Sequence, residues 1–206
     1  MLDLLKFFQE AGRTSYCVVK MSRTFPLYRQ GEDVDIFCYS VADFTKKILA
    51  WGNDYVKDGY SIQVTNLHQK QQLHVDLLKD EGLQFRFDLY GELPVYKKLM
   101  LKPALFESVI ENAQTIPYQA GSEMAMVKIP SRVDDLLIRY LEFMEYYDVR
   151  PSKLKHLEFI MEQGDQETRE RLLEKLHHYT RLPPIYTPQQ CPFCRLSSRI
   201  KKYLPG

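Results

Sequence analysis

The chain has 206 residues, of which 45% are hydrophobic and 27% are charged, and its formal net charge is +1. These values predict an ordinary globular protein with one large domain, or one domain with a helical extension. The near-neutral charge argues against a nucleic-acid partner held by a broad basic surface. No apolar run is long enough to cross a bilayer and no signal peptide is visible, so we expect no membrane partner. Two of the four cysteines lie in apolar strand patterns, which indicates a reducing, cytoplasmic location.

Hydrophobic periodicity in the first third of the chain alternates between helix and strand. The expected elements, in chain order, are a helix within 2–12, a strand at 16–20, a connector at 22–30, a strand through Asp33 and Asp35, a helix at 41–57 and a strand at 61–66.

The next two runs, 73–78 and 83–90, predict a β-hairpin. The segment Lys79-Asp-Glu-Gly82 suits a three-residue loop with Gly82 in the left-handed conformation. This loop pairs six apolar residues on one face of the hairpin, and a shift of one residue would disrupt that face. The other face then places His74 opposite Asp88, where the histidine either orients the carboxylate, assists deprotonation or makes a cross-strand hydrogen bond.

From Ser131 onward the composition becomes helical. A helix at 103–113 and a short strand at 124–129 come first, and three helices then start near Ser131, at Pro151 and after Gly164. The aromatic residues of the first of these helices are expected in the core between packed helices. The sequence therefore predicts an α/β (α+β) fold with a mixed sheet over 1–130, a helical bundle over 131–180, and a linker with a basic tail over 181–206.

The strongest chemical signal is the pair Asp33 and Asp35. Val34, Ile36 and Cys38 alternate with them, so both carboxylates lie on one face of a strand. Two carboxylates this close repel each other, and hard divalent cations are bound by carboxylate oxygens. This window alone leaves both a metal site and a solvated strand end open, and the rest of the chain decides between them.

The order of these features resembles the nucleotidyltransferase superfamily of the DNA polymerase β type. Ser22 follows the first strand, Asp33 and Asp35 come about ten residues later, and Asp88 on a later strand supplies a third carboxylate. The likeness covers roughly residues 1 to 130. The segment 127–137 also looks like bacterial nucleotidyltransferase-like proteins found with surface-glycan genes.

The resemblance implies metal-dependent transfer of a nucleotidyl group from an NTP to a small acceptor that bears a hydroxyl or a phosphate. The implied catalytic and metal residues are Asp33, Asp35 and Asp88, which would hold Mg²⁺, or Mn²⁺ in its place. The residues expected to bind the nucleotide are Lys20, Ser22, Arg23, Arg29 and Lys102.

Two features leave alternatives open. The glycine that the superfamily carries before Ser22 is Met21 here, which favours a second hypothesis: a catalytically inactive fold that serves as a binding or regulatory module with a protein partner. Cys191 and Cys194 form a Cys-x-x-Cys pair after His177 and His178, but a second such pair is missing, so we do not expect a zinc site.

Overall fold

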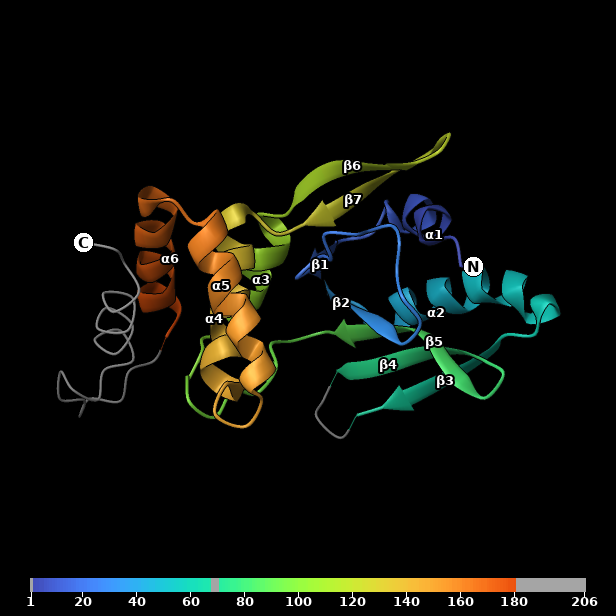
Figure 1. The fold of residues 1–206 in the computed structure, drawn as a ribbon, viewed down its shortest axis with the longest axis horizontal. Helices are drawn as coiled ribbons and strands as arrows, with labels where there is room; N and C mark the ends of the chain where they lie inside the picture. Colours follow the sequence, from blue (N-terminus) through green and yellow to red (C-terminus); the bar gives the residue numbers. More distant parts are fainter. Residues whose placement is uncertain (1, 68–70, 181–206) are drawn as a thin grey trace.

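The computed structural model describes residues 2–67 and 71–180, and these form a mixed α/β fold, as the sequence predicts. The strands are β1 (Tyr16–Val19), β2 (Glu32–Cys38), β3 (Ser61–Asn66), β4 (Gln72–Lys79), β5 (Gly82–Tyr90), β6 (Gln114–Ala120) and β7 (Glu123–Ile129). The first five make one sheet in the order β1-β2-β5-β4-β3, and the last two make a separate hairpin (Figure 1). The sheet is mixed because β2 runs parallel to β5 while its other pairings are antiparallel.

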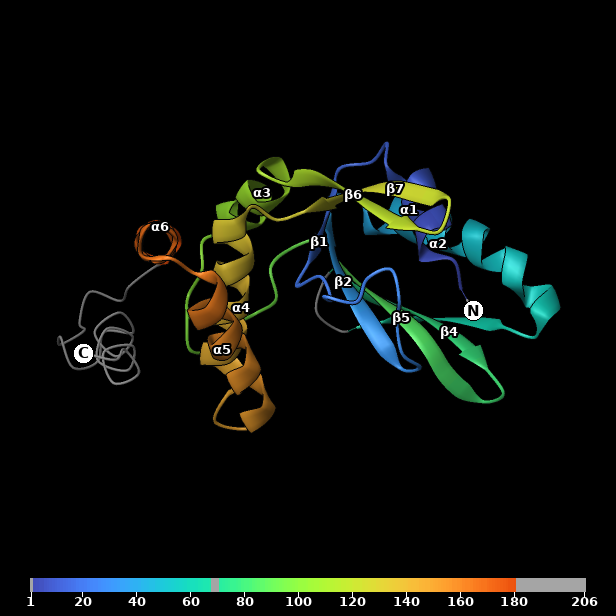
Figure 2. The same cartoon turned by 45° about the horizontal axis from the view of Figure 1, so that its top comes forward.

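The helices cover one face of this sheet and extend to one side of it. They are α1 (Leu4–Ala11), α2 (Val41–Gly52), α3 (Ala104–Glu111), α4 (Arg132–Tyr146), α5 (Leu154–Gln163) and α6 (Gln166–Tyr179), with 3-10 turns at Asn53–Asp58 and Pro151–Lys153. The helix predicted over 41–57 thus ends as α2 at Gly52 and continues as a 3-10 turn. Figure 2 shows α1 and α2 beside the sheet and α3–α6 grouped away from them.

The β4–β5 hairpin has the predicted register but a different turn. Leu73 pairs with Leu89, and His74 pairs with Asp88. The loop holds only two residues, Asp80 and Glu81, and these, rather than Gly82, adopt positive φ angles. The turn is one residue shorter than predicted, and a bulge at Leu77/Leu78 compensates for the missing residue. The register that buries the apolar face is therefore kept.

The strand β6 was not expected from the sequence. It pairs along its length with β7, and Pro117 lies opposite Met126 near its middle. Proline lowers the strand signal because it cannot donate a ladder hydrogen bond, and it is tolerated here because this two-stranded hairpin leaves one side of β6 unpaired. Phe25 of the connector packs edge-on against Tyr118 of β6, with ring centroids 4.8 Å apart. The hairpin thus supports the segment that leads to β2.

Two hydrophobic cores hold these layers together. The first lies between the sheet and helices α1 and α2, and includes Phe7, Trp51 and Phe87, each at most 1% exposed. The second lies among α3–α6 and reaches the other side of β1 and β2 through Val19 and Phe37. Since α1 and α2 occupy only one face of the central strands, the polar face of β2 and β5 remains available for a site.

Within the described residues, the structure contains no helix that is both long and apolar enough to span a membrane. The expected linker and basic tail over 181–206, with Cys191 and Cys194, lies outside the described residues, so the expectation on zinc is not tested there. The domain division at residue 130 also stays a prediction, and α3, which precedes it, packs with the later helices.

Candidate active site

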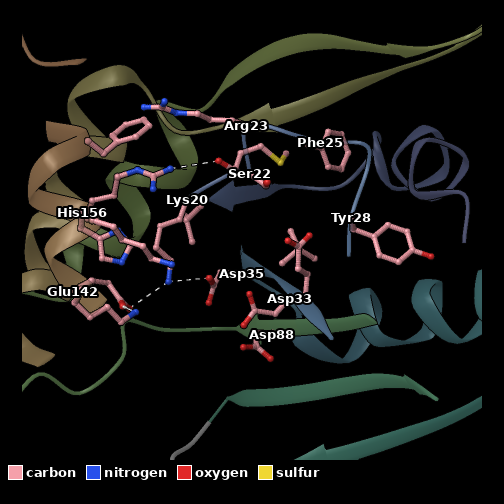
Figure 3. A pocket seen from close by; sticks show the side chains of 18 of the residues that line it. Lys20, Ser22, Arg23, Phe25, Tyr28, Asp33, Asp35, Asp88, Glu142 and His156 are labelled. Carbon is pink, nitrogen blue, oxygen red and sulfur yellow. Dashed lines mark hydrogen bonds and ion pairs between the residues drawn. The ribbon is translucent and has the colours of Figure 1, made fainter. Parts of the chain in front are cut away.

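The three aspartates singled out from the sequence lie on two neighbouring strands. The parallel register of β2 and β5 sets Asp35 directly opposite Asp88, and Asp33 opposite Arg86. Because side chains alternate along a strand, all three carboxylates point to the same side of the sheet. They line a cleft of about 690 Å³ between the sheet and the helices α4 and α5 (Figure 3).

Asp88 is buried, and one of its carboxylate oxygens lacks a hydrogen bond among the described residues. Its side chain is 12% exposed, and its Oδ1 is buried without a hydrogen-bond partner among the described residues. His74 Nε2 lies 3.3 Å from this oxygen, but the contact lacks the alignment of a hydrogen bond. Burial, followed by the charges of Asp35 and Asp33, raises the pKa of Asp88 to about 7. The group is therefore partly protonated at pH 7, and a nearby cation would stabilise its ionised form.

The nearest basic side chains do not supply that cation. Burial and the charge of Arg86 lower the pKa of His74, so the imidazole is neutral at pH 7. Arg86 itself binds Asp76 with both arms of its guanidinium, at 2.6 and 2.9 Å, and lies 3.9 Å from Asp88 Oδ1. The geometry commits Arg86 to Asp76 because a two-armed pair of this kind fixes the guanidinium plane.

Asp35, by contrast, is paired. Lys20 Nζ lies 2.8 Å from Asp35 Oδ2 and 3.3 Å from Glu142 Oε1 of α4, and Tyr90 donates a hydrogen bond of 3.2 Å to Asp35 Oδ1. Burial alone would lower the pKa of Lys20, but Asp35 and Glu142 raise it above its ordinary value. Lys153 completes the network at 2.5 Å from Glu142 Oε2. The charged Lys20 therefore joins the sheet to the helical side of the cleft (Figure 3).

The backbone at Lys20 is unusual. Its φ angle is 55°, in the left-handed region that side chains other than glycine's rarely adopt. The sequence-based expectation concerned the absence of a glycine at Met21, but the left-handed residue in this chain is the one before it. Such a conformation costs of order 1 kcal/mol or more and persists where surrounding contacts fix it. Here those contacts are the ion pairs of Lys20 with Asp35 and Glu142.

The other residues predicted to bind a nucleotide divide into two groups. Ser22 and Arg23 line the cleft with Lys20, and Arg23 pairs with Glu162 at 2.7 Å. Arg29 and Lys102 do not line it. Lys102 Nζ instead donates to the backbone carbonyl of His178 at 2.6 Å, which places it against α6.

Sequence reasoning missed the polar residues that α4 contributes. Arg139, Glu142 and Tyr146 all line the cleft, and their spacing of three and four residues puts them on one face of the helix. That spacing could have predicted a polar face of the helix. The aromatic residues between them, such as Tyr140 and Phe143, favoured the prediction of a core helix instead. The core assignment of those two is confirmed, since they are 1% and 4% exposed.

The donor chemistry of the three aspartates fits a hard divalent cation, because carboxylates that repel one another surround a buried oxygen that lacks a partner. As the side chains lie in this structure, no group of three or more His, Cys, Asp or Glu residues within 2–67 and 71–180 is placed to hold a metal ion. An ion held by all three aspartates would therefore require their side chains to move, and Asp35 would have to give up its ion pair with Lys20.

Comparison with protein-family models, with curated proteins and with solved structures gives no match for this chain.

Proposed function

We propose that the protein transfers a nucleotidyl group from an NTP to a hydroxyl group of a small acceptor, with a divalent cation held by Asp33, Asp35 and Asp88. The observation that carries the proposal is the convergence of these carboxylates from adjacent strands on one cleft, with Asp88 Oδ1 buried and without a hydrogen bond among the described residues. The order of Ser22, the aspartate pair and the third aspartate along the chain supports the same class of protein.

The reaction exchanges a phosphoanhydride bond of the NTP for a phosphoester bond to the acceptor. The acceptor oxygen forms a bond to the α-phosphorus, the bond from that phosphorus to the pyrophosphate oxygen breaks, and the hydroxyl proton passes to solvent. Mg²⁺ at the three aspartates would neutralise the phosphate charge that develops. The protein contributes mainly position and charge, because phosphoryl transfer asks for little covalent chemistry from it.

The residues opposite the aspartates suit the phosphates of the NTP. Lys20 is held at the cleft by its ion pairs with Asp35 and Glu142, and Ser22 and Arg23 follow it along the same wall. A cation bound by Asp35 would leave the Lys20 ammonium paired with Glu142, from where it would reach a phosphate oxygen in the cleft. Arg29 and Lys102 have no part in this proposal, because they lie outside the cleft.

A specific observation also favours a second candidate function. The ion pair between Lys20 and Asp35 already neutralises one of the expected metal ligands, and Met21 stands where the superfamily has glycine. Both features suit a fold that has lost catalysis and serves as a binding or regulatory module for a protein partner. The free, buried Cys17 and Cys38 support a reducing, cytoplasmic setting for either candidate.

The test is Mg²⁺-dependent nucleotide binding, measured by calorimetry for each of the four NTPs. We expect binding by the wild-type protein and its loss in Asp33→Ala/Asp35→Ala, while Asp43→Asn on the outer surface of α2 serves as control. Pyrophosphate release with a panel of hydroxyl compounds then tests turnover. Equal binding in wild type and the double variant, or no binding in either, refutes the catalytic proposal. Absence of binding together with a stable co-purifying protein supports the regulatory candidate instead.

A further inference from the structure

The start of α5 carries positive charge where a helix normally favours negative charge. Its N-cap is Lys153, which makes no capping hydrogen bond through its side chain, and its first turn contains no acidic residue. Lys155 lies in that turn, and Arg150 precedes the 3-10 turn that leads into it. Cations at a helix N-terminus are unfavourable because the helix dipole is positive there. An anion bound at this end would reverse the effect.

The charges at this end of α5 are only partly neutralised within the protein. Lys153 pairs with Glu142 at 2.5 Å. Among the residues that the structure describes, neither Arg150 nor Lys155 has a carboxylate within ion-pair distance, and Arg150 instead lies over the Tyr146 ring at 5.4 Å from its centroid. All three basic residues line the cleft that holds the aspartates. Two cations in this part of the cleft therefore remain available to an anionic ligand.

An independent observation at the same place is His156. The residue is 4% exposed, it lines the cleft, and neither ring nitrogen has a hydrogen-bond partner among the described residues. Figure 3 shows the ring on the helical side of the cleft, beside Glu142 and facing Lys20. A buried polar group without a partner carries an energetic cost, because it has lost its hydrogen bonds to water. That cost is recovered when a ligand supplies the missing partner.

The charge state of His156 defines what it can bind. Burial, followed by the positive charge of Lys153, lowers its pKa to about 4. The imidazole is therefore neutral at pH 7 and offers one hydrogen-bond donor and one acceptor. Such a group suits a hydroxyl or a protonated phosphate oxygen beside the positive charges of Arg150 and Lys155.

We propose that Arg150, Lys153, Lys155 and His156 form a site for a phosphate group, here named the α5 phosphate site. It lies in the same cleft as the three aspartates, on the helical wall opposite the sheet. The phosphate comes either from the acceptor or from the NTP itself. Its assignment to a substrate of the reaction rests on the proposed function, whereas the binding of phosphate at this site does not.

The first experiment measures binding of inorganic phosphate and of a hexose 1-phosphate to the full chain by calorimetry. We expect saturable binding of both, weakened about tenfold in Arg150→Gln/Lys155→Gln, because two charge-assisted contacts are lost. Lys46→Gln/Lys47→Gln on α2 removes the same charge away from the cleft and should bind as the wild type does. No saturable binding by the wild type, or equal weakening in both double variants, overturns the proposal.

The second experiment tests His156 separately. His156→Phe should weaken binding of the hexose 1-phosphate, and His156→Gln should restore part of it, because an amide replaces the lost hydrogen bonds. Circular dichroism verifies that both variants are folded. If a folded His156→Phe binds the hexose 1-phosphate as tightly as the wild type, His156 is not part of the site.

The third experiment identifies the source of the phosphate. If Arg150→Gln/Lys155→Gln loses the hexose 1-phosphate but keeps ATP with Mg²⁺, the site belongs to the acceptor. If it loses ATP to the same degree, and ATP displaces inorganic phosphate from the wild type, the site belongs to the NTP. Asp33→Ala/Asp35→Ala should keep its binding of inorganic phosphate, so a failure of the proposed nucleotidyl transfer is distinguishable from a failure of the α5 phosphate site.

Discussion

Replacing Asp88 by asparagine should stabilise the metal-free protein at alkaline pH. The pKa of Asp88 rises from an ordinary value of 3.8 to about 7, chiefly through burial. At 1.36 kcal/mol per pH unit, the ionised carboxylate at pH 8 opposes folding by about 4 kcal/mol. Water reaches the cleft and relaxes part of this penalty, so we expect Asp88→Asn to raise the free energy of unfolding by about 2 kcal/mol at pH 8.

The sign of the pH dependence follows from proton binding. Between pH 3.8 and about 7 the folded protein keeps a proton on Asp88 that the unfolded chain has released. The stabilisation present below this range is therefore lost as the pH rises through it. Asp88→Asn lacks this group, so its stability relative to the wild type should increase from pH 5 to pH 8, and about a third of the full effect should already be present at pH 5, which lies above the ordinary pKa of the carboxyl group.

Urea unfolding at pH 5 and pH 8 with a chelator present measures the effect. Asp76→Asn is the matched control, because Asp76 is equally buried on the same sheet face but is paired with Arg86, so its loss should destabilise the protein at both values of pH. Mg²⁺ at about 100 times its dissociation constant should add about 2.7 kcal/mol to the wild type and nothing to Asp88→Asn. An Asp88→Asn variant no more stable than wild type at pH 8 refutes this account of Asp88.

Four further substitutions test the rest of the structure. Lys20→Met leaves the carboxylate of Asp35 without its buried partner, so it should lower the free energy of unfolding by about 3 kcal/mol while tightening Mg²⁺ binding, as urea unfolding and calorimetry would show. Lys175→Met removes the ammonium that lies 2.5 Å from the fully buried Asp134, so it should lower the free energy of unfolding by about 3 kcal/mol. Arg171→Met, which removes one partner of an exposed pair, should change that free energy by less than about 0.5 kcal/mol. Phe87→Ala empties a fully buried position between the sheet and α2 and should cost about 3–5 kcal/mol in thermal or urea unfolding, and a smaller loss would contradict the packing described.

Local patterns predicted the parts of the fold that depend on one element or on a short turn. The alternation around Asp33 placed β2 correctly, and burial of the apolar face of the hairpin set the register of β4 against β5 even though the turn differs. The sequence did not predict strand β6, because Pro117 interrupts its alternating pattern. The segment is a strand because it pairs with β7.

The sequence predicted the acidic residues of the candidate site but not most of its basic residues. Strand periodicity alone sets Asp33, Asp35 and Asp88 on polar faces, and the structure brings those faces together. The basic side depends on how the helices pack against the sheet, which no short pattern encodes. For that reason Glu142 and Arg139 were missed, and Lys102, which follows the Asp88 strand along the chain, turns away toward α6.

The parallel pairing of β2 with β5 also determines when the site can form as the chain folds. The hydrogen bond from Tyr90 to Asp35 joins residues 55 positions apart, and the intervening chain must complete α2, β3 and β4 before the two strands meet. Closing so long a loop is entropically unfavourable until the later contacts compensate for it. A nascent chain that ends before β5 can therefore carry Asp33 and Asp35 but has neither the third carboxylate nor the cleft.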